Sequence, residues 1–581
     1  MQPTPTTNDR LTLRRGDFTA LPEALDHAAG GRTGFNFYSA RGELTAVLTY
    51  HELRERAVAT ARGLIAAGLP PRARMVLVAD TDPDFIVLFL ACQYAGILPV
   101  PVAVPTTLGG HAAYVAGLRR QLEGCGAAAA AAPAALLALL REAAEGLAVG
   151  LVGAPADFYA LPPGGADLRP FGCDDPAYLQ YSSGSTRFPL GVDIRQRALV
   201  ANVQGMVLGG VAAVIGDRGV SWLPLYHDMG LVGFVLGPLL YQGSVDLIAT
   251  RDFARRPLVW PAVMSRNGGT VSFSPSFGYE LTAQRAVGDA LASLELHRWR
   301  VAGIGGDMIQ PAVLDRFAAA FAPCGFRASA FLPSYGMAEV THGVSFAEVG
   351  RGVRIDRVER EILADRGEAV PASAGNGAGA RDLVICGPPL PGHRVEIRDD
   401  EGRALPERRL GRICVHGPSV MAGYFNEPEA TAEVLTPDGW LDTGDLGYLV
   451  DGAVVISGRS KDLIIINGRN IWPQDVEWEV ESLPGIRKGD VAAFATEAPG
   501  GGERLTLLVQ CRDNDPARRA ALVREIEGLT KRTVAVEPFV VLIAPRGLPH
   551  TSSGKLSRSR ACQNYLDGVY TDNPALATAA D

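Results

Sequence analysis

The 581-residue chain lacks the features that mark membrane, secreted and metal-binding proteins. No apolar run approaches the roughly 18 to 20 residues that a membrane helix requires, so we expect no membrane span. The first ten residues, MQPTPTTNDR, have neither the basic start nor the apolar core of a secretory signal. The eight cysteines are dispersed without a CxxC pair, so we expect buried thiols rather than a zinc site or disulfide framework. These absences predict a soluble, cytoplasmic protein.

The sequence also lacks an excess of positive charge. Its formal net charge is -8, which argues against nucleic acid as a partner, because phosphate binding needs concentrated basic surface. The acidity lies before residue 458, since the last 124 residues carry 16 basic and 16 acidic side chains. The chain is several times the usual domain length of roughly 100 to 200 residues, so at least two domains are expected.

Short β-branched runs alternate with stretches of apolar period near 3.6. MVLVAD from Met75, VVISG from Val454 and DLIIING from Asp462 predict strands, and the alternation indicates an α/β fold of sheets flanked by helices. The Ala- and Leu-rich segment 126–150 is interpreted as a structural helix. The terminal segments PTPTTNDR and TDNPALATAAD are polar or built from small residues, so we expect both to be disordered.

Neither GxxxxGK[ST] nor GxGxxG occurs, so phosphate binding would need a different loop. YSSGSTRFPLGV, which begins at residue 181, offers one. Small side chains let backbone N–H groups approach phosphate oxygens, and hydroxyl groups add donors. The residues of this type are Ser182, Ser183, Gly184, Ser185 and Thr186. Taken alone, the segment is also compatible with a solvent-exposed turn.

Six further segments follow this loop. They are WLPLYHDMGLVG from Trp222, IGGDMI from Ile304, PSYGMAEVTHG from Pro333, GWLDTGDLGY from Gly439, SGRSKDLIIINGRNIWPQDVE from Ser457 and LPHTSSGKLSRSR from Leu548. Each has an ordinary explanation by itself, such as a core histidine, a turn or a solvated lysine. Together, in this order and spacing, they resemble the adenylate-forming enzymes, the superfamily of acyl-CoA synthetases, luciferases and nonribosomal adenylation domains.

This resemblance covers the chain from about Tyr50 to Lys555 and implies an architecture. A large AMP-binding domain, residues 1–457, would contain sheets flanked by helices and a small β-barrel-like subdomain. A small mobile α+β domain, residues 458–581, would follow, with Lys461 at the hinge. The GRN segment, Gly468 to Asn470, would border the thiol route after the small domain rotates.

The resemblance also implies a nucleotide site for ATP and Mg²⁺. The ring of Tyr335 would stack on adenine, because a flat ring buries the purine face. The carboxylate of Glu339 would hold Mg²⁺, a hard cation that bridges the triphosphate. Asp445 would accept hydrogen bonds from both ribose hydroxyls, and Arg459 would contact ribose or phosphate. The other implied nucleotide-binding residues are the Ser/Gly loop, Gly306, Asp307, Met308, Ser334, Gly336, Met337 and Ala338.

The implied catalytic residues are Lys555, His227 and Glu339. Adenylation brings a carboxylate up to the α-phosphate, so two anions must meet. A mobile ammonium group, here that of Lys555, can hold both in line and offset charge in the transition state. His227 would lie beside the carboxylate of the acid.

Several features resemble one branch, the fatty acyl-AMP ligases. Arg187 replaces the usual Gly and Leu190 the usual Lys of the phosphate loop, and the forms PLYHDMGL and PSFGYEL fit as well. An extra stretch, about residues 351–381, corresponds to an insertion that in this family restrains the small domain and disfavours release to coenzyme A. Within it, RVEREILADRG predicts a short helix and PASAGNGAGA a flexible loop. The implied acyl pocket contains Ser276, Phe277 and Gly278, although SFG departs from the more common NFA, and IGGDM departs from an AEP-like run.

The implied reaction has two steps. A fatty or related carboxylic acid and Mg-ATP give acyl-AMP and pyrophosphate, and the acyl group then passes to the phosphopantetheine thiol of an acyl carrier protein in lipid, polyketide or lipopeptide biosynthesis. Carrier proteins are generally acidic, so the neutral C-terminal part is the expected docking face, with Arg518, Arg519 and Lys531 as candidates. Two alternatives stay open: an acyl-CoA or aryl-CoA synthetase, and a catalytically silent adenylate-binding protein.

Overall fold

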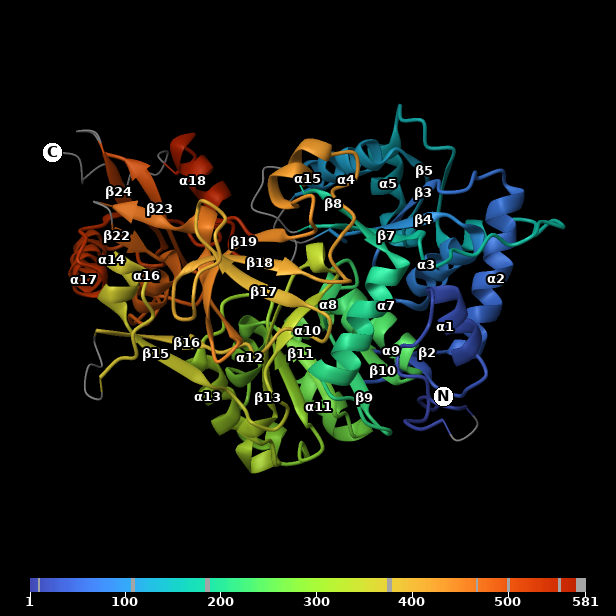
Figure 1. The fold of residues 1–581 in the computed structure, drawn as a ribbon, viewed down its shortest axis with the longest axis horizontal. Helices are drawn as coiled ribbons and strands as arrows, with labels where there is room; N and C mark the ends of the chain where they lie inside the picture. Colours follow the sequence, from blue (N-terminus) through green and yellow to red (C-terminus); the bar gives the residue numbers. More distant parts are fainter. Residues whose placement is uncertain are drawn as a thin grey trace.

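The computed structural model describes residues 1–8, 11–105, 110–182, 189–373, 379–466, 469–498, 502–551 and 555–570. Figure 1 shows an elongated molecule, with the first helices at one end and the C-terminal elements at the other. The predicted α/β class is confirmed: sheets and helices alternate along the chain. No helix among the described residues is both long and apolar enough to cross a membrane.

The largest sheet has eight strands in the order β14-β13-β12-β11-β9-β10-β1-β2. They are β1 (Gly34–Tyr38), β2 (Leu44–Thr49), β9 (Arg218–Ser221), β10 (Ser244–Ile248), β11 (Val271–Ser274), β12 (Val301–Ile304), β13 (Phe331–Gly336) and β14 (Gly343–Phe346). From β1 to β13 the neighbouring strands are parallel, and β2 and β14 pair antiparallel at the two edges. The loops after β12 and β13 therefore meet at one edge, where ligands of open α/β sheets bind.

Helices pack around this sheet. They include α1 (Leu21–Ala28), α2 (Tyr50–Ala66), α3 (Pro83–Ala95), α7 (Gln196–Gly205), α8 (Asp228–Leu231), α9 (Gly237–Tyr241), α10 (Thr250–Arg255), α11 (Val259–Asn267), α12 (Ser276–Ala283) and α13 (Pro311–Phe321), with π-helices η2 (Met206–Gly210) and η3 (Val232–Leu236). Helix α3 shows why such elements form. The Asp82 side chain accepts a hydrogen bond from the N–H of Phe85, Pro83 begins the helix, and Gly96 ends it in a left-handed conformation. Its apolar residues cover all sides, so it is buried.

A second, parallel sheet has the order β4-β3-β5-β6, with β3 (Arg74–Val78), β4 (Leu98–Val102), β5 (Ala127–Ala131) and β6 (Leu151–Gly153). It is flanked by α4 (His111–Cys125), α5 (Leu137–Ala144) and α6 (Pro155–Tyr159). The helix predicted over 126–150 is correct for α5 but wrong for the run of alanines that forms β5. Gly126 ends α4 with φ 57°, and β5 then lies between β3 and β6, where backbone pairing and burial override helix propensity.

Antiparallel strands build the part of the molecule next to the large sheet. They are β7 (Pro176–Tyr181) with β8 (Gly191–Arg195), and the four-stranded sheet β17 (Arg394–Arg398), β18 (Gly411–His416), β19 (Leu441–Val450) and β20 (Ala453–Arg459), followed along the chain by η8 (Ser460–Asp462). Helix α15 (Pro428–Val434) precedes β19. The strands predicted at Met75, Val454 and Asp462 are confirmed as β3, β20 and β21 (Ile464–Ile466).

The C-terminal elements form an α+β unit. It contains β21, β22 (Arg469–Ile471), α16 (Pro473–Val480), β23 (Val491–Glu497), β24 (Glu503–Gln510), α17 (Pro516–Val534), β25 (Phe539–Ile543) and α18 (Arg558–Leu566). These elements bury their own apolar clusters. The predicted boundary at residue 458 falls within the last residues of β20, and Lys461 lies in η8 directly after it.

The predicted insertion contains β15 (Ile355–Glu359), α14 (Arg360–Arg366) and β16 (Ala380–Val384). The short charged helix is confirmed as α14. The antiparallel pairing of β15 with β16 was not predicted. Half of PASAGNGAGA, residues 374–378, lies outside the described residues.

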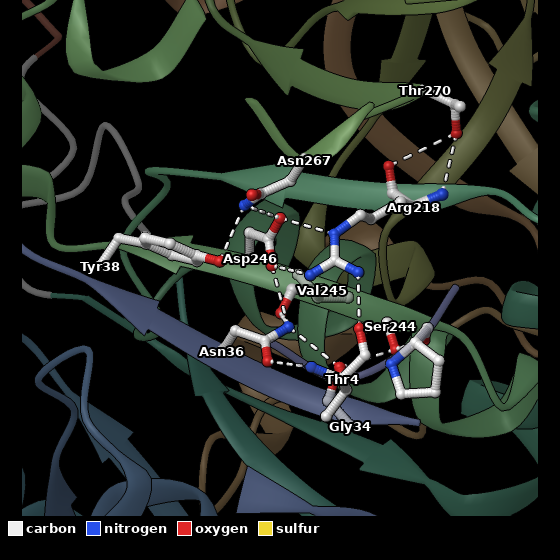
Figure 2. A network of polar contacts seen from close by, with 11 residues as sticks. Thr4, Gly34, Asn36, Tyr38, Arg218, Ser244, Val245, Asp246, Asn267 and Thr270 are labelled. Atoms are coloured by element: carbon white, nitrogen blue, oxygen red, sulfur yellow. Dashed lines mark hydrogen bonds and ion pairs between the residues drawn. The ribbon is translucent and has the colours of Figure 1, made fainter. Parts of the chain in front are cut away.

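The amino-terminal segment corrects a prediction, because Thr4 is buried rather than disordered. Figure 2 shows it joined to a buried ion pair in which Nε of Arg218 lies 2.7 Å from Oδ2 of Asp246. Arg218 also donates to the carbonyl of Thr4, whose N–H donates to Asn36, both at 2.8 Å. The hydroxyls of Thr4 and Ser244 lie 2.9 Å apart. Buried charged and polar groups require such partners, and the terminal segment provides them.

The cysteines are all free, in agreement with the absence of a CxxC pair. Six are buried as expected: Cys92, Cys125, Cys324, Cys386, Cys414 and Cys511. The prediction of buried thiols is wrong for Cys173, which is exposed, and Cys562 is half-buried. Cys173 lies in the turn before β7, and Cys562 lies in α18.

Candidate active site

A cleft of about 950 Å³ lies between the large sheet, the β19–β20 hairpin and the C-terminal unit. It gathers predicted site residues from segments far apart in the chain. These are Ser182, His227, Phe277, Gly306, Ser334, Tyr335, Gly336, Met337, Ala338, Glu339, Asp445, Arg459, Lys461 and Lys555. Asp307 and Met308 line an adjoining cavity of about 170 Å³, which also reaches Tyr335 and Lys555.

Some predicted residues are not placed in this cleft. Ser183, Gly184, Ser185, Thr186 and Arg187 lie outside the described residues. Ser276 and Gly278 line neither cavity. The Ser276 hydroxyl donates to the carbonyl of Met308 at 3.3 Å, and the backbone of Gly278 packs against Trp222. Phe277 alone of the predicted acyl pocket faces the cleft.

Tyr335, Asp445 and Arg459 form one side of the cleft. Asp445 and Arg459 are register partners on β19 and β20, which places the guanidinium Nε 3.5 Å from the carboxylate. The Tyr335 hydroxyl donates to Oδ2 of Asp445 at 2.7 Å. Burial raises the pKa of Asp445, and Arg459 acts in the opposite direction. The result is a carboxylate held between a ring and a cation, with one face toward the cleft.

Two glycines give the cleft its shape. Gly306 follows β12 with φ 78°, and a Cβ there would lie 2.7 Å from the Met229 side chain. A Cβ on Gly336 would lie 1.9 Å from the carbonyl oxygen of His342, where β13 turns into β14. A side chain at either position would push the backbone away from the cleft.

His227 and Lys555 approach each other from the two parts of the molecule. Burial lowers the pKa of His227 to about 4; Asp228 raises it in part and Lys555 lowers it further. Nε2 of His227 has no hydrogen-bond partner among the described residues and is buried. Burial also lowers the pKa of Lys555, which the carboxylate of Asp307 partly offsets. The site therefore combines a neutral imidazole with a cation that has no ion-pair partner among the described residues.

Glu339 lies in the turn after β13 and is buried. The hydroxyl of Tyr424 donates to its Oε1 at 3.0 Å, a contact that the sequence did not indicate. Burial raises the pKa of Glu339, and the hydrogen bond from Tyr424 and the charge of Arg459 act in the opposite direction. Its environment suits a bound cation that would offset the buried charge.

A second cavity, of about 110 Å³, continues from the cleft and is almost entirely apolar. It shares Met229, Phe273, His342 and Phe346 with the cleft. From there it follows the face of the large sheet past π-helices η2 and η3 to the amino ends of β9 and β10. Sequence reasoning missed this cavity, because its walls come from segments that carry no common pattern.

This fold and site define a class of protein, and the family comparison identifies it. Residues 39–425 match the model of the AMP-binding enzyme family. The chain belongs to this family and is an AMP-forming ligase.

Individual proteins similar to this chain carry names that agree with this family. A Caulobacter vibrioides protein with the provisional name acyl-CoA synthetase is 49% identical over 98% of this chain and 99% of its own length. The long-chain-fatty-acid–AMP ligase FadD23 of Mycobacterium tuberculosis is 32% identical over 86% of this chain and 87% of its own. A structure from studies of fatty acyl-adenylate ligases of E. coli and L. pneumophila has a TM-score of 0.92 and 42% identity, covering 96% of this chain and 100% of that one.

Proposed function

We propose that the protein activates a fatty acid with ATP to acyl-AMP and passes the acyl group to the phosphopantetheine thiol of an acyl carrier protein. The observation that carries the first half is the convergence of Lys555 and His227 between a nucleotide-type surface, Tyr335 with Asp445, and an apolar cavity. In this reaction a carboxylate oxygen of the acid bonds to the α-phosphorus of ATP. The bond from that phosphorus to the bridging oxygen breaks, and pyrophosphate leaves.

Lys555 and His227 would divide the work at the reacting atoms. The ammonium group of Lys555 can contact both the carboxylate and the α-phosphate and so offset the repulsion between them. His227, neutral because of its lowered pKa, can donate one hydrogen bond to the carboxylate and adds no second positive charge beside Lys555.

Glu339 fits a divalent cation that binds together with ATP. Its carboxylate is buried, oriented by Tyr424 and free of a cationic partner in contact among the described residues. Mg²⁺ held there and by the substrate phosphates would neutralise the charge of the polyphosphate. Tyr424 fixes which carboxylate oxygen remains available.

The apolar cavity supports a fatty acid as the substrate. Each buried CH₂ group contributes about 0.8 kcal/mol of binding free energy. The cavity opens from the cleft at Met229 and His342 and has almost no polar wall, so it can receive an alkyl chain whose carboxylate stays in the cleft. The names of the mycobacterial ligase and of the E. coli and L. pneumophila enzymes agree with this choice.

The insertion supports a carrier-bound thiol as the acceptor, because it is tied to the C-terminal unit. Nε of Arg381 in β16 lies 2.9 Å from the carboxylate of Asp475 in α16, and both side chains are buried. The guanidinium of Arg381 stacks 4.2 Å from the Trp472 ring. Arg469 pairs with Asp365 of α14 at 3.1 Å. These contacts would restrain rotation of the C-terminal unit and hinder the route for free coenzyme A.

The name of the Caulobacter relative favours a second candidate, an acyl-CoA synthetase. One experiment separates the two. Pyrophosphate exchange with a panel of fatty acids measures acyl-AMP formation, and coenzyme A and holo carrier protein are then offered separately. We expect exchange with fatty acids and acylation of the carrier protein. Acylation of coenzyme A alone would establish the second candidate, and no exchange with any acid would leave an adenylate-binding protein without catalysis.

The ion pairs of the candidate carrier-docking residues favour a different choice. Arg518 is paired with Asp513 at 2.6 Å and Lys531 with Glu537 at 3.8 Å, so their charges are partly offset. Arg519 donates to backbone carbonyls. Arg546 and Arg560 are exposed at the cleft, and neither has an ion-pair partner among the described residues.

We therefore assign docking of an acidic carrier to Arg546 and Arg560. Changing both to Glu should slow acyl transfer more than the matched change at Arg518 and Lys531. Pyrophosphate exchange by the same variants shows whether adenylation itself is affected. Equal transfer rates in the two double variants would contradict this assignment.

A further inference from the structure

A second histidine, His342, lies at the neck between the cleft and the apolar cavity. It lines both, together with Met229, Phe273 and Phe346. An acyl chain that starts beside His227 and enters the cavity must pass this side chain. None of the roles proposed above uses it.

One nitrogen of His342 is fixed. Its Nδ1 lies 3.0 Å from Oδ2 of Asp228, the residue after His227. Burial alone would raise the pKa of Asp228, but the hydrogen bond with His342 and the charge of Lys555 lower it, so the carboxylate stays ionised. An ionised carboxylate accepts a hydrogen bond from the Nδ1–H group and sets the orientation of the ring.

The other nitrogen remains available. Nε2 has no hydrogen-bond partner among the described residues, and 13% of the side chain is exposed. It faces Gly233 of π-helix η3, where a Cβ would lie 3.7 Å away. π-Helical turns occur frequently at functional sites, and this one keeps a side chain out of the space beside the ring.

The position of the imidazole is rigid as well. The carbonyl of His342 accepts a hydrogen bond of 2.8 Å from the N–H of Met337, across the turn from β13 to β14. The neck therefore presents one fixed polar nitrogen inside a wall of Met and Phe side chains. An unsubstituted alkyl chain would remove water from this nitrogen and offer no replacement.

We propose that His342 recognises a hydroxyl group on one of the first carbons beyond the carboxyl group, so that 2- or 3-hydroxy fatty acids are the preferred substrates. The inference rests on the proposed function. A hydroxyl group can donate and accept, so it pairs with Nε2 in either protonation state of the ring. Sites that hydrogen-bond a substrate hydroxyl discriminate strongly against the analogue without it.

The test measures kcat/KM for pyrophosphate exchange with acids of one chain length: unsubstituted, 2-hydroxy, 3-hydroxy and terminally hydroxylated. For the unmodified protein we expect the 2- or 3-hydroxy acid to exceed the unsubstituted acid by about 10-fold. The terminal hydroxyl should give no advantage, because it would lie deep in the apolar cavity.

Two variants test whether the preference for hydroxy acids depends on His342. His342→Leu should reduce the ratio of hydroxy to unsubstituted acid to near 1, and His342→Gln, which keeps a hydrogen-bonding group, should retain part of it. A melting temperature checks folding, and the ratio is taken within each variant, so a general loss of activity does not affect it.

Each other outcome has a definite meaning. Exchange without any preference for hydroxy acids leaves the proposed function in place and overturns this inference. Equal losses with both acids in His342→Leu also overturn it, because they indicate a purely structural role. No exchange with any acid overturns the proposed function and this inference together.

Discussion

The hydroxyl group of Tyr335 donates a hydrogen bond of 2.7 Å to the carboxylate of Asp445, although 110 residues separate them. The first residue carries the ring expected to stack on adenine, and the second the carboxylate expected to bind ribose. Their contact links β13 of the large sheet to β19 of the antiparallel sheet. The two halves of the expected nucleoside site are thus held in one arrangement.

Tyr335→Phe should weaken ATP binding while keeping the ring. Loss of a hydrogen bond to a charged group costs about 1.5–3 kcal/mol, so we expect the KM for ATP to rise by roughly 10-fold or more. Tyr335→Ala should cost more, because stacking is lost as well. Steady-state kinetics at saturating fatty acid measures both, and a Tyr335→Phe enzyme with an unaltered KM would contradict the linkage.

Lys555→Ala should remove most adenylation activity and leave the fold intact. Loss of a preorganised charge at the reacting atoms lowers kcat by about 10²- to 10³-fold. Because burial lowers the pKa of Lys555, activity should also decline at alkaline pH earlier than an ordinary lysine would allow. Pyrophosphate exchange measures both effects.

Lys531→Ala is the matched control for Lys555, since Lys531 is exposed on α17. Its rate of pyrophosphate exchange should equal that of the unmodified protein. Near-normal acyl-AMP formation by Lys555→Ala would refute the catalytic role.

His227 should make stability depend on pH. Its pKa is about 4 in the folded protein against an ordinary 6.5, so the unfolded chain binds a proton first as the pH falls. The stability from this neutral group is complete above pH 6.5 and is lost as the pH falls toward 4, by about 2–3 kcal/mol. Urea unfolding of the protein and of His227→Gln across this pH range isolates the contribution of His227 to the free energy of unfolding.

His51→Gln serves as the control for this measurement, because His51 is exposed on α2. It should keep the pH dependence of the unmodified protein. Identical slopes for His227→Gln and the unmodified protein would show that His227 does not carry the effect.

Arg381→Met should destabilise the contact between the insertion and the C-terminal unit. Removing one partner of a buried ion pair typically costs about 3–5 kcal/mol, because the other charge stays buried. Arg381→Met combined with Asp475→Asn should lose less than the sum of the single changes. Urea unfolding measures the energies, and additive losses would contradict coupling between the two residues.

The same variants test the role of the insertion. If the ion pair restrains the C-terminal unit, Arg381→Met should transfer more acyl group to coenzyme A than the unmodified protein does. The comparison uses acyl-CoA formed per acyl-AMP consumed, which is independent of the amount of folded enzyme.

The sequence by itself determined the family and supplied the candidate site residues, whose roles stay predictions. Tyr335, Glu339, Asp445 and Lys555 could be predicted because each stands in a short motif, and the order of the motifs is specific although each alone is not. Strands such as β3 and β20 followed from β-branched runs, since a local pattern matches their burial.

Only the tertiary structure decided the features that depend on distant segments. Ala127–Ala131 became a strand because two neighbouring strands pair with it, against its helix propensity. Thr4 is ordered because Arg218 and Ser244 need its polar groups. The walls of the apolar cavity and the contact of His342 with Asp228 join segments over a hundred residues apart, and no local pattern encodes such a distance.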